Sequence, residues 1–193
     1  MQNLMQKQLV IIGGGLAGCE CALALARAGL PSTLYEQKPE AFSPAHVSEG
    51  LGELVCSNSF RSNDVQGSGV GLLKQEMREL GSEVMAIAET CSVPAGKALA
   101  VDREGYARMV TEHIKNHPNI SLVEEEITEI PEGEVVIASG PLTSDALAEK
   151  IAEKCPDSDL HFYDAAAPIV MLDSIDMESA FYASRYDKGD ADC

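Results

Sequence analysis

The chain is poor in basic residues and contains no long hydrophobic run. It has 14 Lys and Arg residues against 31 Asp and Glu residues, which gives a net charge of −17 at neutral pH. A chain this acidic is a poor general binder of phosphate backbones. No stretch approaches the roughly 18–20 apolar residues that span a membrane, and residues 1–7 lack the basic start and apolar core of a signal peptide. We therefore expect a cytoplasmic protein without a membrane-spanning segment.

The shortage of positive charge is unevenly distributed. Residues 1–110 hold nine basic and twelve acidic residues, whereas residues 111–193 hold five basic and nineteen acidic residues. Any surface that contacts nucleic acid should therefore lie in the nearly neutral first part or largely outside this chain. At 193 residues the chain is long enough for one large core, or for one domain and part of a second.

Paired cysteine motifs are also absent. The six cysteines include no CxxC pair that would bind zinc and no CxxxxC redox pair. We therefore expect no metal site and no flavin disulfide reductase. Cys19 and Cys21 fall within the first expected helix, where they should be small buried thiols. The acidic run Glu124–Glu126 is typical of a solvated strand end rather than of a metal site.

The most informative segment of the chain runs from Leu9 to Glu36. An apolar strand at its start is followed by a glycine-rich turn, an alanine-rich helix that reaches Gly29, and a second strand that ends in an acid. A dinucleotide-binding site requires this order of elements.

Each glycine of the turn has its own expected role. Gly13 allows the tight turn, Gly15 lets the backbone approach a pyrophosphate, and Gly18 lets the helix pack closely on the strand. The start of the helix offers free N–H groups and a partial positive charge to the phosphates. We therefore predict a cofactor site that consists of Gly13, Gly14, Gly15, Leu16, Ala17, Gly18 and Glu36.

The residues around the glycines favour FAD as the dinucleotide. Glu36, eighteen residues after Gly18, is placed to accept hydrogen bonds from an adenosine ribose, and its charge repels the 2′-phosphate of NADP. The small residues Ala22 and Gly29 continue the spacing of FAD-binding versions of the motif, which favours FAD over NAD. An ordinary tight turn between a strand and a helix is the alternative that the glycines alone leave open.

The remaining pattern predicts an α/β fold with a parallel sheet. Residues 37–67 are rich in Pro, Gly, Ser and Asn, which indicates a long functional loop. Ser139–Pro141 is a small-residue turn where the sheet should meet the cofactor again. The other expected elements are a helix at 69–88 with Gly81 as a break point, a turn at 92–96, a strand at 98–101, a helix capped by Asp102 and ending near 116, strands at 120–123 and 135–138, a helix at 144–154 and a strand at 160–163.

Apolar residues recur at helical spacing between residues 69 and 88, which predicts that they belong to the core. They are Leu72, Leu73, Met77, Leu80, Val84 and Ile87.

A candidate catalytic residue lies in the loop from Glu53 to Phe60, where Cys56 stands among small polar residues. A cysteine near a flavin can act as a nucleophile or as an acid–base thiol. Arg61 and Arg103 would lower its pKa if they came close. A structural cysteine is the alternative.

Eight segments of the chain together resemble one protein family. They are residues 44–46, 53–59, 92–96, 98–103, 125–133, 140–144, 162–169 and 184–189. Several of them serve no general dinucleotide-binding purpose. These motifs resemble those of the folate- and FAD-dependent tRNA (uracil-5-)-methyltransferases, TrmFO, and the resemblance extends from Leu9 to about Asp190.

The resemblance implies an enzyme that methylates carbon 5 of uracil in the T-loop of tRNA. In this family the carbon comes from methylenetetrahydrofolate, and FAD carries reducing equivalents that NAD(P)H supplies. A thiolate that adds to carbon 6 of uracil makes carbon 5 nucleophilic, and the base must leave its stack to be reached. Cys56 matches the first of two cysteines implicated in the family, although the resemblance leaves open which of the two attacks uracil.

Members of this family are much longer than this chain. The resemblance therefore implies a Rossmann-like FAD-binding core in residues 1–140, with a functional loop insertion at about 37–67, that is incomplete at its C-terminus. Residues 141–193 would be the truncated start of a region on the substrate and tRNA side. Most of the surface that binds tRNA would then lie outside this chain.

The chain departs from the family pattern at two places. Val47 replaces a second histidine that commonly follows the position of His46, and Cys193 directly follows Asp192, so neither His46 nor Cys193 is assigned a role. Two other interpretations stay open. The first is the related glucose-inhibited division protein A family, which modifies wobble uridine with FAD, and the second is a truncated, non-catalytic FAD-binding module.

Overall fold

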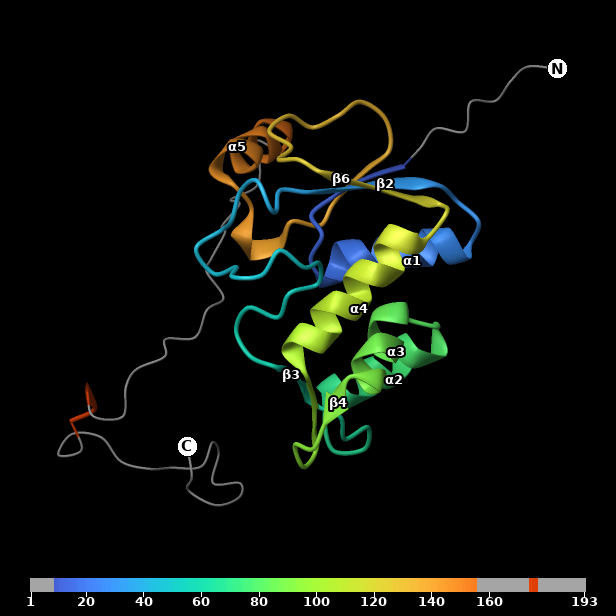
Figure 1. The fold of residues 1–193 in the computed structure, drawn as a ribbon, viewed down its shortest axis with the longest axis vertical. Helices are drawn as coiled ribbons and strands as arrows, with labels where there is room; N and C mark the ends of the chain where they lie inside the picture. Colours follow the sequence, from blue (N-terminus) through green and yellow to red (C-terminus); the bar gives the residue numbers. More distant parts are fainter. Residues whose placement is uncertain (1–8, 156–173, 177–193) are drawn as a thin grey trace.

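The computed structural model describes residues 9–155 and 174–176. Four parallel strands form the main sheet in the order β6-β2-β1-β7 (Figure 1). The predicted α/β class with a parallel sheet is therefore confirmed. The strands are β1 (Leu9–Ile12), β2 (Ser32–Glu36), β6 (Ile120–Glu124) and β7 (Val135–Ile137).

The register of the sheet brings the carboxyl ends of its strands to one edge. Ile12 lies opposite Tyr35 on one side and Ile137 on the other, and Glu36 lies opposite Glu124. Ligands of open parallel sheets bind at this edge. The loops that leave it, including the turn η1 (Gly140–Leu142) and the start of α5 (Asp145–Lys154), are therefore placed to form a site.

Helix α1 (Leu16–Arg27) joins β1 to β2, and α4 (Arg103–Asn116) leads into β6. The buried face of α1 consists largely of small residues, including Cys19 and Ala22, which are fully buried. Small side chains let a helix lie close to the strands that it covers. The helix ends at Arg27, and Gly29, two residues later, has the positive φ of 75° that suits a glycine after a helix C-terminus.

A second group of elements packs against α1 and α4 (Figure 1). It contains an antiparallel sheet in the order β3-β5-β4, which the sequence did not predict. Residues 92–93 were expected in a turn but form β4, because their backbone pairs with β5. Ser92 lies opposite Val101 in this antiparallel pair. The elements are β3 (Ser59–Ser62), α2 (Gly69–Glu79), α3 (Glu83–Thr90), β4 (Ser92–Val93) and β5 (Ala98–Val101).

Two charged residues of α1 hold the turn between α2 and α3. Arg27 donates hydrogen bonds to the carbonyl oxygens of Leu80 and Gly81 at the end of α2. Glu20 Oε2 accepts hydrogen bonds from Ser82 Oγ at 2.8 Å and from the Val84 N–H at 2.9 Å. The helix that starts at the glycine turn therefore also anchors the second group of elements.

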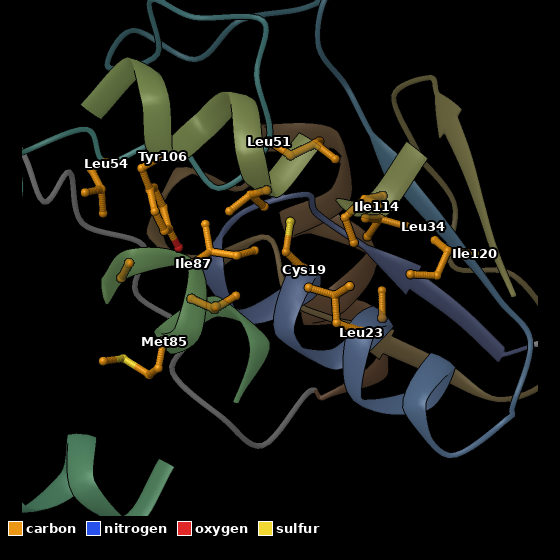
Figure 2. Packing of buried hydrophobic residues seen from close by; sticks show 14 of the residues in the cluster. Cys19, Leu23, Leu34, Leu51, Leu54, Met85, Ile87, Tyr106, Ile114 and Ile120 are labelled. Carbon is orange, nitrogen blue, oxygen red and sulfur yellow. The ribbon is translucent and has the colours of Figure 1, made fainter. Parts of the chain in front are cut away.

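The core lies where α1, α3 and α4 meet the main sheet. Figure 2 shows Cys19 of α1 between Ile87 on one side and Leu34 and Ile114 on the other, all of them buried. Tyr106 of α4 is fully buried, and its ring meets the ring of Phe60 edge-on at 5.4 Å between centroids. One continuous hydrophobic cluster thus joins the two groups of elements.

The predicted helix at 69–88 is two helices, with the expected break at Gly81, whose φ is 74°. The prediction that its apolar residues are core is right for Val84 and Ile87 but wrong for three leucines. Leu80 is 77% exposed because it falls in the turn between the helices. The other two exposed leucines are Leu72 and Leu73.

On the buried face of α2, a lysine takes the place of a large apolar residue. Lys74 is 4% exposed, and its amine donates hydrogen bonds to the carbonyl oxygens of Phe60 at 2.8 Å and Val70 at 3.1 Å. Burial lowers the pKa of this amine, and the nearby Arg78 lowers it further. The helix is thereby joined to β3 by hydrogen bonds as well as by packing.

The other expected elements lie within two residues of their predicted bounds. Asp102 occupies the N-cap position of α4 as expected, although its side chain makes no capping hydrogen bond. The strand expected at 160–163 lies outside the described residues. Among the residues that the structure does describe, no helix is long and apolar enough to cross a membrane.

Ile87 is buried and Leu80 is exposed, so their substitution should affect stability differently. Ile87→Ala should lower the free energy of unfolding by about 2–5 kcal/mol, because it leaves a cavity in the core. Leu80→Ala removes a side chain that is mostly in solvent and should change it by less than about 0.5 kcal/mol. Urea unfolding followed by circular dichroism measures both values, and equal losses would contradict the assignment of Leu80 to the surface.

Candidate functional site

A pocket opens at the carboxyl edge of the parallel sheet, with a cavity volume of about 290 Å³. One wall consists of the loops that follow the strands, namely residues 13–17, 36–37, 125–127 and 138–144. His46, Glu53 and Val55 from the long loop after β2 also line the pocket and form its loop wall. The small-residue turn Ser139–Pro141 therefore lies at the pocket, as its position after β7 predicted.

Two glycines of the turn are required by the protein's own packing. Gly13 has a φ of 106°, and a Cβ atom added there would lie 2.7 Å from the Cα of Ser139. A Cβ added at Gly18 would lie 1.8 Å from the carbonyl oxygen of Gly13. Both positions exclude any larger residue because the strand, the turn and the helix pack too closely.

Gly15 is different, because none of the residues that the structure describes requires a glycine there. Its backbone is extended, with φ −74° and ψ −171°, which any residue adopts easily. A Cβ added at Gly15 would meet no atom of these residues within 4 Å, and Gly15 lines the pocket. The space beside this backbone therefore suits ligand atoms that approach it closely, as a pyrophosphate does.

The start of α1 provides donors for such an anion. Gly15 occupies the N-cap position without a side-chain capping hydrogen bond, and the first turn contains no acidic residue. Leu16 and Ala17 line the pocket, so their N–H groups and the positive end of the helix dipole face the same space as Gly15. Backbone donors, dipole and free space together fit a dinucleotide phosphate.

Glu36 is held at the end of β2 by two backbone hydrogen bonds. Its Oε2 accepts from the Gly14 N–H at 2.8 Å, and its Oε1 accepts from the Lys38 N–H at 3.0 Å. The residue is only 7% exposed, yet it lines the pocket. Because each carboxylate oxygen can accept a second hydrogen bond, Glu36 can still receive a ribose hydroxyl.

The sequence did not predict a buried ion pair that shapes the loop wall. Lys38 Nζ lies 3.3 Å from Glu53 Oε2, and both side chains are 2% exposed. The same amine donates to the carbonyl oxygens of Ser48 at 3.0 Å and Gly50 at 2.6 Å. The only sequence signal was two opposite charges within a stretch of small residues, which does not reveal that they meet.

Glu53 also binds the backbone of the loop that it faces. Its Oε1 accepts hydrogen bonds from the N–H groups of Val47 at 3.0 Å and Ser48 at 3.2 Å. Removing one partner of a buried ion pair leaves an uncompensated charge, which costs about 3–5 kcal/mol. The segment that follows His46 is therefore fixed by side chains rather than by regular secondary structure.

Cys56 lies beside the pocket and is exposed. Its neighbour Val55 lines the pocket, whereas the cysteine itself does not. Within the described residues, neither Arg61 nor Arg103 forms a hydrogen bond with it. The structure thus gives the thiol access to solvent at the edge of the pocket, and its catalytic role stays a prediction.

The parallel sheet, its helices and the glycine turn at the carboxyl edge define a Rossmann-type α/β fold. A family model described as glucose inhibited division protein A matches residues 8–192. The match covers nearly the whole chain, and the chain belongs to this family.

Sequence relatives agree with the resemblance drawn from the motifs, which is thereby confirmed. The chain is 57% identical to the methylenetetrahydrofolate–tRNA-(uracil-5-)-methyltransferase TrmFO of Geobacter sulfurreducens, over 97% of this chain and 43% of the relative. It is 54% identical to the TrmFO of Bacillus licheniformis, again over 97% of this chain and 43% of the relative. The chain therefore spans less than half the length of these relatives.

Solved structures show the same fold at much lower identity. The GidA protein of Aquifex aeolicus in one crystal form matches with a TM-score of 0.54 and 20% identity, over 69% of this chain and 25% of that chain. A second crystal form of the same protein gives a TM-score of 0.51 at 21% identity, over 65% of this chain and 21% of that chain. At this identity the likeness concerns the fold alone.

The contrast between Gly15 and Gly18 predicts separate effects on binding and on folding. Gly15→Ala should change the free energy of unfolding by less than about 0.5 kcal/mol but weaken ADP binding about tenfold, or about 1.4 kcal/mol. Gly18→Ala should destabilise the ligand-free chain by about 3 kcal/mol or more, because the added Cβ would push α1 away from the carbonyl oxygen of Gly13. Calorimetric titration with ADP and urea unfolding test the pair, and a destabilised Gly15→Ala variant would contradict the contrast.

The thiol of Cys19 predicts how stability depends on pH. Burial, with a smaller contribution from the charge of Glu36, raises the pKa of Cys19 to about 12, against an ordinary value of 9.0. Above pH 9 the unfolded chain loses this proton while the folded chain keeps it, so stability falls as the pH rises toward 12. Between pH 9 and 10.5 the loss should be about 2 kcal/mol.

The Cys19→Ala variant isolates this contribution, because other buried groups titrate identically in both proteins. Urea unfolding at pH 8, 9.5 and 10.5 should give a smaller loss of stability for the variant than for the unsubstituted chain. Parallel losses in the two proteins would show that Cys19 is not the titrating group.

Proposed function

We propose that this chain is the cofactor-binding part of an enzyme that methylates carbon 5 of uracil in the T-loop of tRNA, with methylenetetrahydrofolate as carbon donor. The observation that carries the proposal is the identity of 53–57% to proteins named TrmFO, which runs over nearly all of this chain. The matched region covers 96–97% of this chain. The reaction acts on tRNA, in agreement with the cytoplasmic location expected from the sequence.

The proposed cofactor is FAD, held by the residues that the glycine motif predicted. The N–H groups of Gly15, Leu16 and Ala17 would bind the pyrophosphate, and Glu36 would accept a ribose hydroxyl. Gly13 and Gly14 shape the turn, and Gly18 packs the helix against it. When bound, FAD supplies the transfer of reducing equivalents from NAD(P)H that side chains cannot perform.

Cys56 is assigned to the substrate side of the reaction, as the nucleophile or as an acid–base thiol. Its exposure at the edge of the pocket gives a uracil base access to the sulfur. A sulfur that adds to carbon 6 of uracil moves electron density toward carbon 5, which then attacks the one-carbon donor. The buried thiol of Cys19 is unsuited to this role because burial raises its pKa to about 12.

The charge of the chain supports the proposal that it binds the cofactor and that most tRNA contacts lie elsewhere. Residues 1–140 form the proposed FAD-binding core, and residues 141–193 begin the region on the substrate side. With 31 acidic and 14 basic residues, the chain offers little general attraction for tRNA. The main tRNA-binding surface is therefore proposed to lie outside this chain.

A chimaeric enzyme tests the proposal. Residues 8–192 of this chain should replace the matching region of the Geobacter sulfurreducens TrmFO, and the chimaera is assayed with FAD, NADPH, methylenetetrahydrofolate and tRNA that lacks ribothymidine. We expect 5-methyluridine at the T-loop. Cys56→Ala should lower its formation about a thousandfold or more, whereas Cys21→Ala, a matched change outside the pocket, should leave it intact.

Product analysis separates this function from that of the wider family. Modification of wobble uridine in place of the T-loop would favour the glucose inhibited division protein A type of reaction. Full methyl transfer by the Cys56→Ala chimaera would overturn the role of Cys56. A chimaera that folds but retains no flavin would overturn the proposed cofactor.

A further inference from the structure

His46 is a half-buried residue on the pocket wall that the long loop provides. Its Nδ1 lies 2.7 Å from Ser43 Oγ. That oxygen also accepts a hydrogen bond from the Ala45 N–H at 3.4 Å, which favours the arrangement in which the serine proton points at Nδ1. We assign the tautomer in which Nδ1 accepts and Nε2 carries the proton.

The Nε2–H group of this tautomer has no acceptor within the part of the chain that the structure describes. Burial lowers the pKa of His46, and the charge of Lys38 lowers it further, whereas the carboxylates of Glu53 and Glu36 act in the opposite direction. At neutral pH the ring is therefore an uncharged donor. Such a donor suits an oxygen or nitrogen acceptor on a ligand.

The other polar side chain on this wall is hydrogen-bonded on both of its oxygens and has no proton to donate. Glu53 accepts two backbone N–H groups on one oxygen and the amine of Lys38 on the other. This network fixes the backbone at Val47 and Ser48, directly after His46. The imidazole is therefore the side chain of this wall that is both held in place and free to bind.

We propose that His46 is a ligand-binding residue whose Nε2–H donates a hydrogen bond to the nucleotide in the pocket. The glycine turn and the start of α1 offer backbone donors to this pocket, and His46 adds a side-chain donor from the long loop. The inference rests on the proposed function in one respect, namely that FAD is the nucleotide. Its acceptor is an oxygen or a ring nitrogen of that nucleotide.

Binding affinity provides the first test, with the 193-residue chain and FAD as the probe. His46→Phe keeps a ring of similar size but removes the donor, and it should weaken FAD binding about three- to tenfold, the effect of one hydrogen bond. His46→Gln places an amide N–H near the position of Nε2 and should restore affinity to within about twofold. His113→Phe, on the exposed side of α4, is the matched control and should bind FAD like the unsubstituted chain.

Histidine NMR provides a readout that a purely structural role would not move. In the chain labelled with ¹⁵N-histidine, FAD should shift the Nε2 resonance of His46, identified by its loss in His46→Gln, and leave that of His113 in place. Ser43→Ala should alter the Nδ1 resonance of His46 before any ligand is added. These two results would support the donor and its tautomer.

The outcomes distinguish this inference from the proposed cofactor. If the unsubstituted chain binds FAD and His46→Phe binds it equally tightly, the role of His46 is overturned while the cofactor proposal stands. If His46→Phe and His46→Gln lose affinity alike, the donor role is also overturned. If only the chimaera binds FAD, the same His46 variants are compared in the chimaera, with the same outcomes. If neither the unsubstituted chain nor the chimaera binds FAD, the cofactor proposal falls, and this inference falls with it.

Discussion

The shape of the pocket depends on hydrogen bonds from backbone N–H groups to two buried carboxylates. Glu36 receives the N–H of Gly14 and thereby fixes the glycine turn, whereas Glu53 receives those of Val47 and Ser48 and fixes the loop after β2. A buried N–H group without a partner costs about 1–3 kcal/mol. Gly14, Val47 and Ser48 lie outside helices and strands, so these carboxylates replace the hydrogen bonds that a helix or strand would provide.

Lys38 links the two carboxylates into one network. Its backbone N–H donates to Glu36, and its side-chain amine donates to Glu53 and to two carbonyl oxygens of the loop. The Gly52 N–H in turn donates to the carbonyl oxygen of Gly14 at 2.8 Å. The glycine turn and the loop that leads to Cys56 are therefore joined at several points, and a displacement of one wall is resisted by the other.

The sequence predicted the part of the site that depends on local spacing. Residues 13–18 and Glu36 follow a strand–turn–helix–strand order, and the parallel sheet brings them together as expected. The pairing of Lys38 with Glu53 depends on the path of a long loop, which no periodicity encodes. The exposed Leu80 shows the same limit, because helical spacing identifies an apolar face but not whether another element covers it.

The two kinds of glycine also differ in what a substitution would act on. A side chain at position 18 would collide with the backbone of the turn, whereas a side chain at position 15 would meet none of the described residues and would enter the pocket instead. A change at position 18 therefore acts on whether the turn and helix can form, and a change at position 15 acts on the space that the pocket leaves open.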